Sequence, residues 1–141
     1  LMYAEAVLHG YGSPASSVPG FDLTAVDAIN VIRNRAQLPD LTNKYAATKE
    51  AFMGEIIRER AVELAFEGHR FHDLRRWNIH DQLKYREKTA VDFDRDPVTG
   101  KPRNIRERVI ITRVVEKKHN WLPLQLSDTY IYPHFGQNPG W

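Results

Sequence analysis

The sequence predicts a mainly α-helical protein with a few short β-strands and long irregular loops. Apolar residues recur at helical spacing through residues 1–77, and β-branched residues gather in RVIITRVV at residues 108–115. Gly, Pro and Ser interrupt both patterns. The 141 residues are 42% hydrophobic and 27% charged, which is typical of a globular domain. The formal net charge of +2 is too small to indicate a nucleic-acid or anionic-membrane partner.

Residues 1–40 are expected to form a helical hairpin. The first helix ends near Gly10 to Gly12, and a Gly/Pro/Ser loop follows. Thr24 is placed to cap the second helix, with Asp27 in the position of a capping box, and Pro39 ends it. The first helix opens without a capping residue before it, so we expect further residues to precede Leu1.

Residues 48–77 are expected to form a charged helix that breaks once, at Gly68. Thr48 is placed to cap its start, and Gly68 to close its first part in a left-handed conformation. Val62 and Phe66 lie nearly opposite the main apolar face, a pattern typical of a helix buried between two layers. That main face consists of Met53, Ile56, Ile57, Ala61 and Leu64.

The charges of this helix are expected to pair inside the protein. Arg60, Glu63 and Glu67 lie within about one sixth of the helical circumference. An unpaired buried charge costs several kcal/mol, so these groups indicate an ion network, and we expect Glu67→Ala to disrupt folding. Further partners are available in Arg70, Asp73, Arg75 and Arg76.

Chemical alternatives for the charged stretch are weaker. Glu63 and Glu67 resemble the carboxylate pair of a glycoside hydrolase, but they point the same way and the neighbouring arginines favour two ionised groups. His69 and His72 lack the partners of a known metal-binding pattern. The chain has no cysteine, which excludes disulfides and thiolate chemistry within it. We therefore expect no catalytic residue, no metal and no cofactor.

Residues 78–118 are expected to contain a variable insert followed by a strand. Residues 78–104 are polar and hold the turn signals DRDPVTGKP, while RVIITRVV is typical of a strand. DFDRDPVTG at residues 92–100 alternates acids as calcium loops do, but Pro97 and Arg103 occupy the places of the required Gly and Glu. The basic residues of 101–118 favour a solvated strand face over a nucleic-acid site.

Residues 119–141 are expected to form a C-terminal meander of turns. A short strand is expected at NWLPLQ, and Ser127 is placed to cap a single helical turn.

Three segments resemble the SusD/RagB family. The stretch RERAVELAFEGHRFHDLRRW resembles its C-terminal signature helix, and LPLQLSDTYIYPHFGQNPGW resembles its terminal segment. A third likeness joins YAEAVL and AVDAINVIRNRAQLP to the last helical-repeat pair of the family. The signature residues to which we assign a structural role are Arg60, Glu63, Glu67, Gly68, Arg70, Asp73, Arg76 and Trp77.

The resemblance implies that residues 1–141 are the C-terminal portion of a SusD/RagB-like protein built from tetratricopeptide-like helical pairs. Such proteins are surface-exposed outer-membrane lipoproteins of Bacteroidetes-type bacteria, held by an N-terminal lipid that lies outside this chain. They bind oligosaccharides or peptides without cleaving them, for delivery to a SusC-like TonB-dependent transporter. The alternatives are a helical scaffold without ligand contacts and a glycoside hydrolase.

The insert is the expected source of ligand contacts in this portion. Tyr85 and Phe93 are the candidates, because aromatic rings offer flat platforms for sugars. Trp77 closes the signature helix and is expected in the core.

Overall fold

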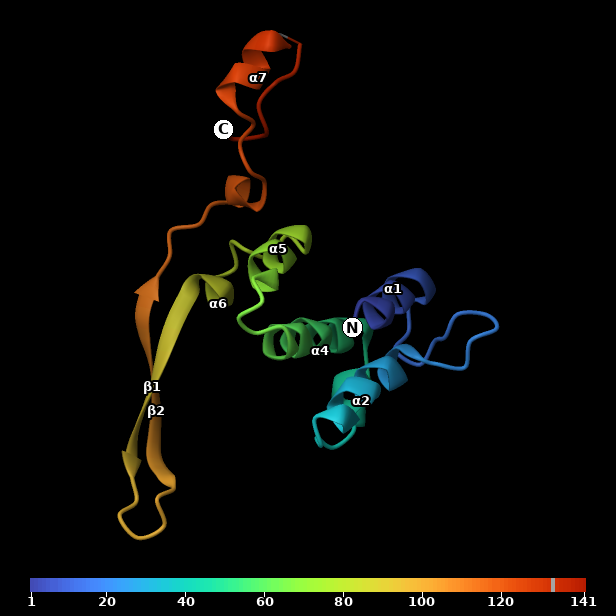
Figure 1. The fold of residues 1–141 in the computed structure, drawn as a ribbon, viewed down its shortest axis with the longest axis vertical. Helices are drawn as coiled ribbons and strands as arrows, with labels where there is room; N and C mark the ends of the chain where they lie inside the picture. Colours follow the sequence, from blue (N-terminus) through green and yellow to red (C-terminus); the bar gives the residue numbers. More distant parts are fainter. Residues whose placement is uncertain (133) are drawn as a thin grey trace. The chain divides into compact units, whose positions relative to one another are not determined.

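A computed structural model describes residues 1–132 and 134–141 of the chain (Figure 1). The chain divides into two compact units, Leu1–Arg70 and Phe71–Trp141. The predicted class is confirmed, since the described residues are mainly helical and contain one two-stranded sheet. No helix in this part of the chain combines the length and the apolar character that crossing a bilayer requires.

The first unit begins with two helices, α1 (Met2–Tyr11) and α2 (Ala25–Arg35). Gly12 ends α1 with φ of 80°, a left-handed conformation that glycine adopts at little cost. Thr24 caps α2 as predicted. Its hydroxyl accepts a hydrogen bond from the Asp27 amide at 3.1 Å, and the Asp27 carboxylate accepts one from the Thr24 amide at 3.2 Å.

The same unit continues with α3 (Asn43–Ala46) and α4 (Lys49–Glu63). Helix α1 contacts both α2 and α4, and Figure 1 shows the three in blue, light blue and green. Their apolar contact forms the core of the unit. Its largest fully buried side chains are Val7, Leu8, Ile29, Phe52 and Ile56.

Helix α4 differs from the prediction at its C-terminal end. Thr48 caps its start through a 3.1 Å hydrogen bond from the Ala51 amide, as expected. The helix ends at Glu63 instead of reaching Gly68, and Phe66 has a positive φ of 66°. Gly68, with φ of 79°, therefore precedes the next helix rather than closing this one.

The buried face of α4 also differs from the predicted one. It contains Phe52 and Ile56 together with the charged Glu55, Glu59 and Arg60. Met53, Ile57, Ala61 and Leu64 are only half-buried. Val62 and Phe66 are exposed, so the expected burial of the helix on two sides is wrong.

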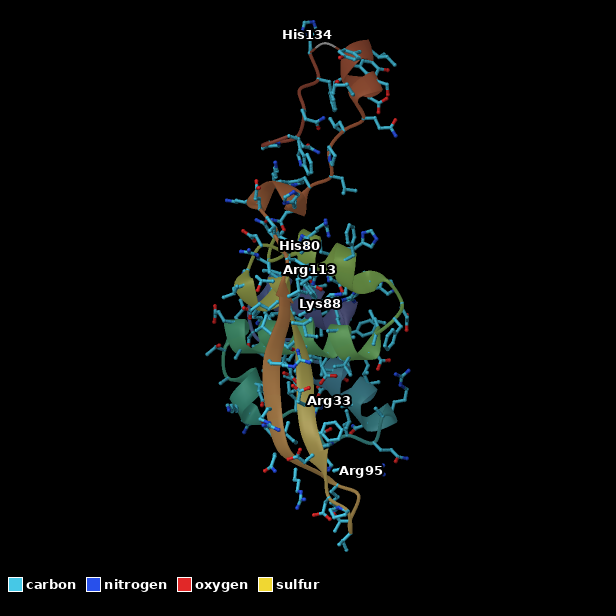
Figure 2. The ribbon with its side chains drawn as sticks, turned by 90° about the vertical axis from the view of Figure 1, so that its left-hand side faces the viewer. Arg33, His80, Lys88, Arg95, Arg113 and His134 are labelled. Atoms are coloured by element: carbon cyan, nitrogen blue, oxygen red, sulfur yellow. The ribbon has the colours of Figure 1, made fainter. Side chains whose placement is uncertain are left out.

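Helix α5 (His69–Arg76) supplies the two further turns expected after Gly68. The second unit then contains α6 (Leu83–Arg86) and two antiparallel strands, β1 (Glu87–Arg95) and β2 (Pro102–Thr112). A strand thus forms inside the segment expected to be irregular, and the predicted strand begins earlier, at Pro102. Figure 2 shows Lys88, Arg95 and Arg113 along this hairpin.

The hairpin contains two register shifts. Asp92 pairs with Arg106 and Asp94 with Arg103, so Phe93 faces two residues of β2. One of these two, Asn104, has φ of 54°, the left-handed conformation found at the first residue of one class of β-bulge. The other shift follows Lys88. The two shifts account for the greater length of β2, which has 11 residues against 9 in β1.

The tail contains a 3-10 turn, η1 (Lys117–Asn120), and a short helix, α7 (Leu126–Ile131). The expected strand at NWLPLQ is wrong, because residues 121–125 adopt no regular structure. Gln125 occupies the N-cap position of α7 and makes no side-chain capping bond, so the predicted capping role of Ser127 is also wrong. The Gln137 side chain bonds both the Leu124 amide and carbonyl, at 2.7 and 2.9 Å, and so closes the loop around α7.

Candidate ligand-binding site

The charged residues of α4 form an ion network with α2. The Arg33 guanidinium bonds the Glu59 carboxylate and lies 3.7 Å from a carboxylate oxygen of Glu55. Arg58 bonds both glutamates as well, and its hydrogen bond to Glu55 raises the pKa of its guanidinium. An inward ion network is therefore present, but it centres on Glu55 and Glu59 and includes Arg33 from α2.

The predicted role of Glu67 in this network is wrong. The Glu67 side chain is 56% exposed, and a carboxylate oxygen lies 3.9 Å from Nε2 of His69. Because α4 ends at Glu63, Glu67 no longer follows the helical spacing that placed it beside Arg60. Glu63 pairs with the exposed Arg35, so this pair also lies at the rim of the network.

The remaining signature residues hold the region around α5 in place. Arg70 donates to the Ile57 carbonyl at 3.3 Å. The buried Asp73 accepts from Nε of Arg76 at 2.8 Å, and the Arg76 guanidinium lies 4.3 Å from the centre of the Trp77 ring. Trp77 is half-buried rather than fully enclosed. Asp73, Arg76 and Trp77 therefore contact one another at the end of α5.

The two predicted ligand residues occupy different places. Tyr85 lies in α6, half-buried, with the Lys84 ammonium 4.8 Å from its ring centre. Phe93 lies at the bulge of β1 and is 56% exposed. It lines a shallow hollow of about 510 Å³ with Val91, Arg95, Gly100, Pro102 and Ile105. Tyr85 is not among the residues that line this hollow.

The alternating acids of the hairpin face arginines. Asp92, Asp94 and Asp96 lie 2.7, 4.0 and 3.6 Å from Arg108, Arg106 and Arg103, respectively. The Asp96 carboxylate also accepts 2.9 Å hydrogen bonds from the Val98 and Thr99 amides, which lower its pKa, that of Thr99 most. These residues therefore shape a turn and pair across the strands. Among the described residues, no group of three His, Asp or Glu side chains is arranged to hold a metal ion.

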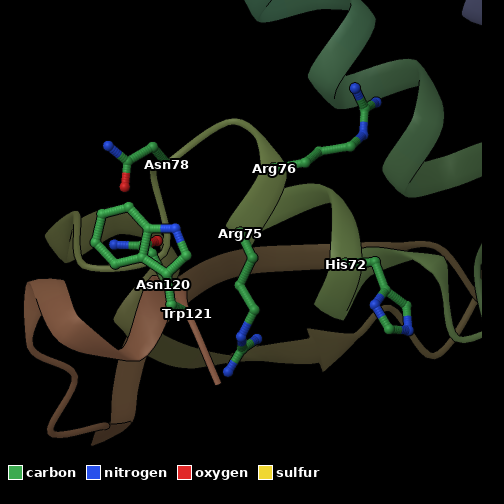
Figure 3. Close-up of a pocket in the computed structure, with 6 residues that line it drawn as sticks. All are labelled: His72, Arg75, Arg76, Asn78, Asn120 and Trp121. Carbon is green, nitrogen blue, oxygen red and sulfur yellow. The ribbon is translucent and has the colours of Figure 1, made fainter. Parts of the chain in front are cut away.

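A second cavity was not predicted. It has a volume of about 460 Å³ and is lined by His72, Arg75, Arg76, Asn78, Asn120 and Trp121 (Figure 3). Three of these residues belong to α5, and Asn78 follows it with a positive φ of 56°. The other two come from the end of η1. We call this site the Trp121 cavity.

Two atoms of residues lining the Trp121 cavity are buried without a hydrogen-bond partner. They are Nε of Arg75 and Oδ1 of Asn120. Asn120 is only 6% exposed, and its amide nitrogen donates to the Lys117 carbonyl at 2.9 Å. A buried polar atom without a partner costs about 1–3 kcal/mol, so a water or ligand atom that bonded either of them would stabilise the site.

The Arg75 side chain is held over an aromatic ring. Its guanidinium carbon lies 3.5 Å from the centre of the Phe71 ring, and Nη1 donates to the Phe71 carbonyl at 3.1 Å. Burial lowers the pKa of Arg75. Burial also lowers the pKa of His80, and the charge of Arg75 lowers it further. The positive charge near the cavity therefore belongs mainly to arginine, because an imidazole of lowered pKa is neutral at pH 7.

The Trp121 cavity combines an aromatic ring with hydrogen-bonding side chains. Trp121 is 45% exposed, which leaves part of its indole available for stacking. No carboxylate is among the described residues that line the cavity, whereas glycoside hydrolysis uses two facing carboxylates. The cavity is therefore suited to binding a polar ring.

Comparisons with known proteins give a consistent result. Residues 1–141 match the model of the SusD family. A crystal structure of a SusD-like protein from Bacteroides fragilis is 28% identical, with a TM-score of 0.69, over 98% of this chain and 23% of that chain. A structure designated BT4246 is 27% identical, with a TM-score of 0.60, over 98% of this chain and 22% of that chain. The chain thus spans less than a quarter of either structure. No curated protein sequence matches it significantly.

Proposed function

Since this chain belongs to the SusD family, we propose that it is part of a cell-surface protein that binds oligosaccharides without cleaving them. The observation that carries the proposal within this chain is the Trp121 cavity. Its indole offers an apolar face to a sugar ring, and its amide and guanidinium groups offer hydrogen bonds to hydroxyls. Tyr85 and the Phe93 hollow are proposed as additional contacts for a longer ligand.

Delivery to a TonB-dependent outer-membrane transporter is part of the same proposal. A binding protein without hydrolytic groups needs a partner that moves the ligand onward. We propose a SusC-like transporter as that partner and the outer-membrane surface as the location, with attachment through an N-terminal lipid outside residues 1–141. Purification of the full-length protein from native membranes tests this step. Recovery of a transporter with it is the expected result, and its consistent absence under mild detergent contradicts it.

Oligosaccharide binding is tested by calorimetry with a panel of plant and host oligosaccharides on the full-length protein. Binding without release of shorter products is expected. Product release would instead favour a hydrolase. A peptide ligand remains the alternative, and a peptide library assayed in parallel distinguishes it.

The rival view is that this portion is only a scaffold. Trp121→Ala separates the two, because the residue is partly exposed and its loss removes the stacking surface. Tyr130→Ala, at an exposed aromatic residue of α7, is the matched control. We expect weaker binding only in the first variant. Unchanged affinity in both would assign ligand contacts to other parts of the protein.

A further inference from the structure

The Trp121 cavity has an uneven charge distribution. Its described lining includes His72, Arg75 and Arg76 but no acidic side chain. Arg76 is already bound to Asp73 through the 2.8 Å contact of its Nε. Figure 3 shows the side chains of Arg75 and Arg76 leaving α5 in different directions. Arg75 is therefore the cation of the cavity whose charge is available to a ligand.

Arg75 has unused binding capacity. In the described structure its polar contact is the single bond from Nη1 to the Phe71 carbonyl, and its Nε is buried without an acceptor. A guanidinium donates five hydrogen bonds and binds a carboxylate in a two-point arrangement. Removing a charge from water costs free energy that an anion in contact offsets. An anionic ligand group would accept hydrogen bonds from the guanidinium and would also offset its positive charge.

The opposite side of the cavity requires a donor. Oδ1 of Asn120 is buried and without a partner, in a residue that is 6% exposed. A hydroxyl group supplies the missing hydrogen. The adjacent Trp121 indole suits the apolar face of a pyranose ring. A single ligand residue that carries a carboxylate, hydroxyls and an apolar ring face therefore matches the three features together.

We propose that the Trp121 cavity binds a hexuronate residue of an acidic oligosaccharide. This inference rests on the proposed oligosaccharide-binding function and adds the chemical class of the ligand. The carboxylate lies against Arg75, a hydroxyl donates to Asn120, and the ring stacks on Trp121. A neutral sugar leaves the Arg75 charge uncompensated, and an acidic peptide lacks the stacking face.

The test compares three ligands by calorimetry on the full-length protein. They are an α-1,4-linked galacturonate trisaccharide, its methyl ester and the corresponding galactose trisaccharide. We expect the acid to bind at least tenfold more tightly than the other two, with an affinity that falls as salt rises. Equal affinity for all three overturns the hexuronate inference and leaves the proposed function intact. If no oligosaccharide in this set or in the wider panel binds, both are overturned.

Variants locate the site. Arg75→Gln should remove the preference for the acid over its ester, while Arg106→Gln, the same charge loss at an exposed hairpin residue, should retain it. Asn78→Asp is a second variant, which leaves Arg75 in place and so tests the site even if Arg75→Gln does not fold. It places a carboxylate at the exposed rim of the cavity, and Asp tolerates the positive φ. This variant should lower the affinity for the acid at least fivefold and leave the affinity for the methyl ester unchanged.

Two outcomes overturn the assignment of the acid to this cavity. One is a preference for the acid over its methyl ester that persists in a folded Arg75→Gln protein. If that protein does not fold, the same preference persisting in Asn78→Asp has the same meaning. The other is competition by a glutamate tripeptide at the same concentration as the uronate, which would place an acidic peptide there instead.

Discussion

Arg33 of α2 binds Glu59 of α4 across 26 residues of sequence, with side chains that are only 12% and 6% exposed. Arg33 also donates to the Pro39 carbonyl at 2.8 Å, which ties the end of α2 to the following loop. This ion pair therefore joins two helices and one loop, and it lies close to Glu55 and Arg58.

Loss of Glu59 is expected to destabilise the fold. Glu59→Ala leaves Arg33 with fewer partners in a largely buried place, so we expect a loss of about 3 kcal/mol in the free energy of unfolding. Urea denaturation measures this. Glu67→Ala is the matched control and should change stability by less than about 0.5 kcal/mol, because Glu67 is exposed. Equal losses in the two variants would contradict the position of the network.

Removal of the α2 cap should have a smaller effect. Thr24→Ala removes the hydroxyl that accepts from Asp27, and we expect a loss of about 1 kcal/mol. Thr42→Ala is the control, because Thr42 precedes α3 but makes no capping bond through its side chain. Thermal unfolding of both variants tests the difference. A larger effect at Thr42 would show that the capping box contributes little.

The sequence predicted such local features well, because each depends on a few adjacent residues. Thr24 and Thr48 carry the signals for the starts of helices, and both cap them as expected. The first helix ends at Tyr11, within the Gly10–Gly12 stretch that predicted its end. The resemblance to a known family extended the prediction to the fold class. Conversely, the apolar face predicted for α4 omitted Phe52, which the structure buries completely.

Long-range features were not predictable in the same way. Strand β1 has the sequence EKTAVDFDR, whose charges hide its alternation, and it forms by pairing with β2. The Trp121 cavity depends on the approach of α5 and η1 residues, whereas the sequence predicts a strand at NWLPLQ. The sequence also does not show that Arg76 pairs with Asp73, which leaves Arg75 as the cation of that cavity without a carboxylate partner among the described residues.

The proposed role of the insert predicts weaker ligand binding in two variants. Phe93→Ala removes the aromatic ring from the hairpin hollow, and Tyr85→Ala removes one from α6. We expect affinity to fall by about tenfold where the ring stacks on a sugar, equivalent to roughly 1.4 kcal/mol. Calorimetry with the best ligand of the panel measures the change. Val98→Ala, at the exposed hairpin turn, is the control. Full affinity in both aromatic variants would remove the insert from the binding site.

The hairpin turn is expected to loosen in acid. Hydrogen bonds from the Thr99 and Val98 amides hold the pKa of Asp96 below its ordinary value of 3.8. Because the folded pKa is the lower one, the contribution of Asp96 is complete above that ordinary value and is lost as the pH falls through the folded pKa. Amide chemical shifts of residues 98 and 99, followed from pH 6 to pH 2, measure the transition. Asp96→Asn keeps the acceptor and should abolish this titration, whereas an unchanged curve would assign it to another group.

The two bulges of the hairpin also bear on self-association. A two-stranded sheet has two open edges, and flat open edges recruit strands from other molecules. The irregular pairing at Phe93 and near Lys88 increases local twist and breaks the even row of backbone donors and acceptors. The charged side chains of β2 add repulsion between copies. The hairpin can therefore remain long and exposed while resisting edge-to-edge aggregation.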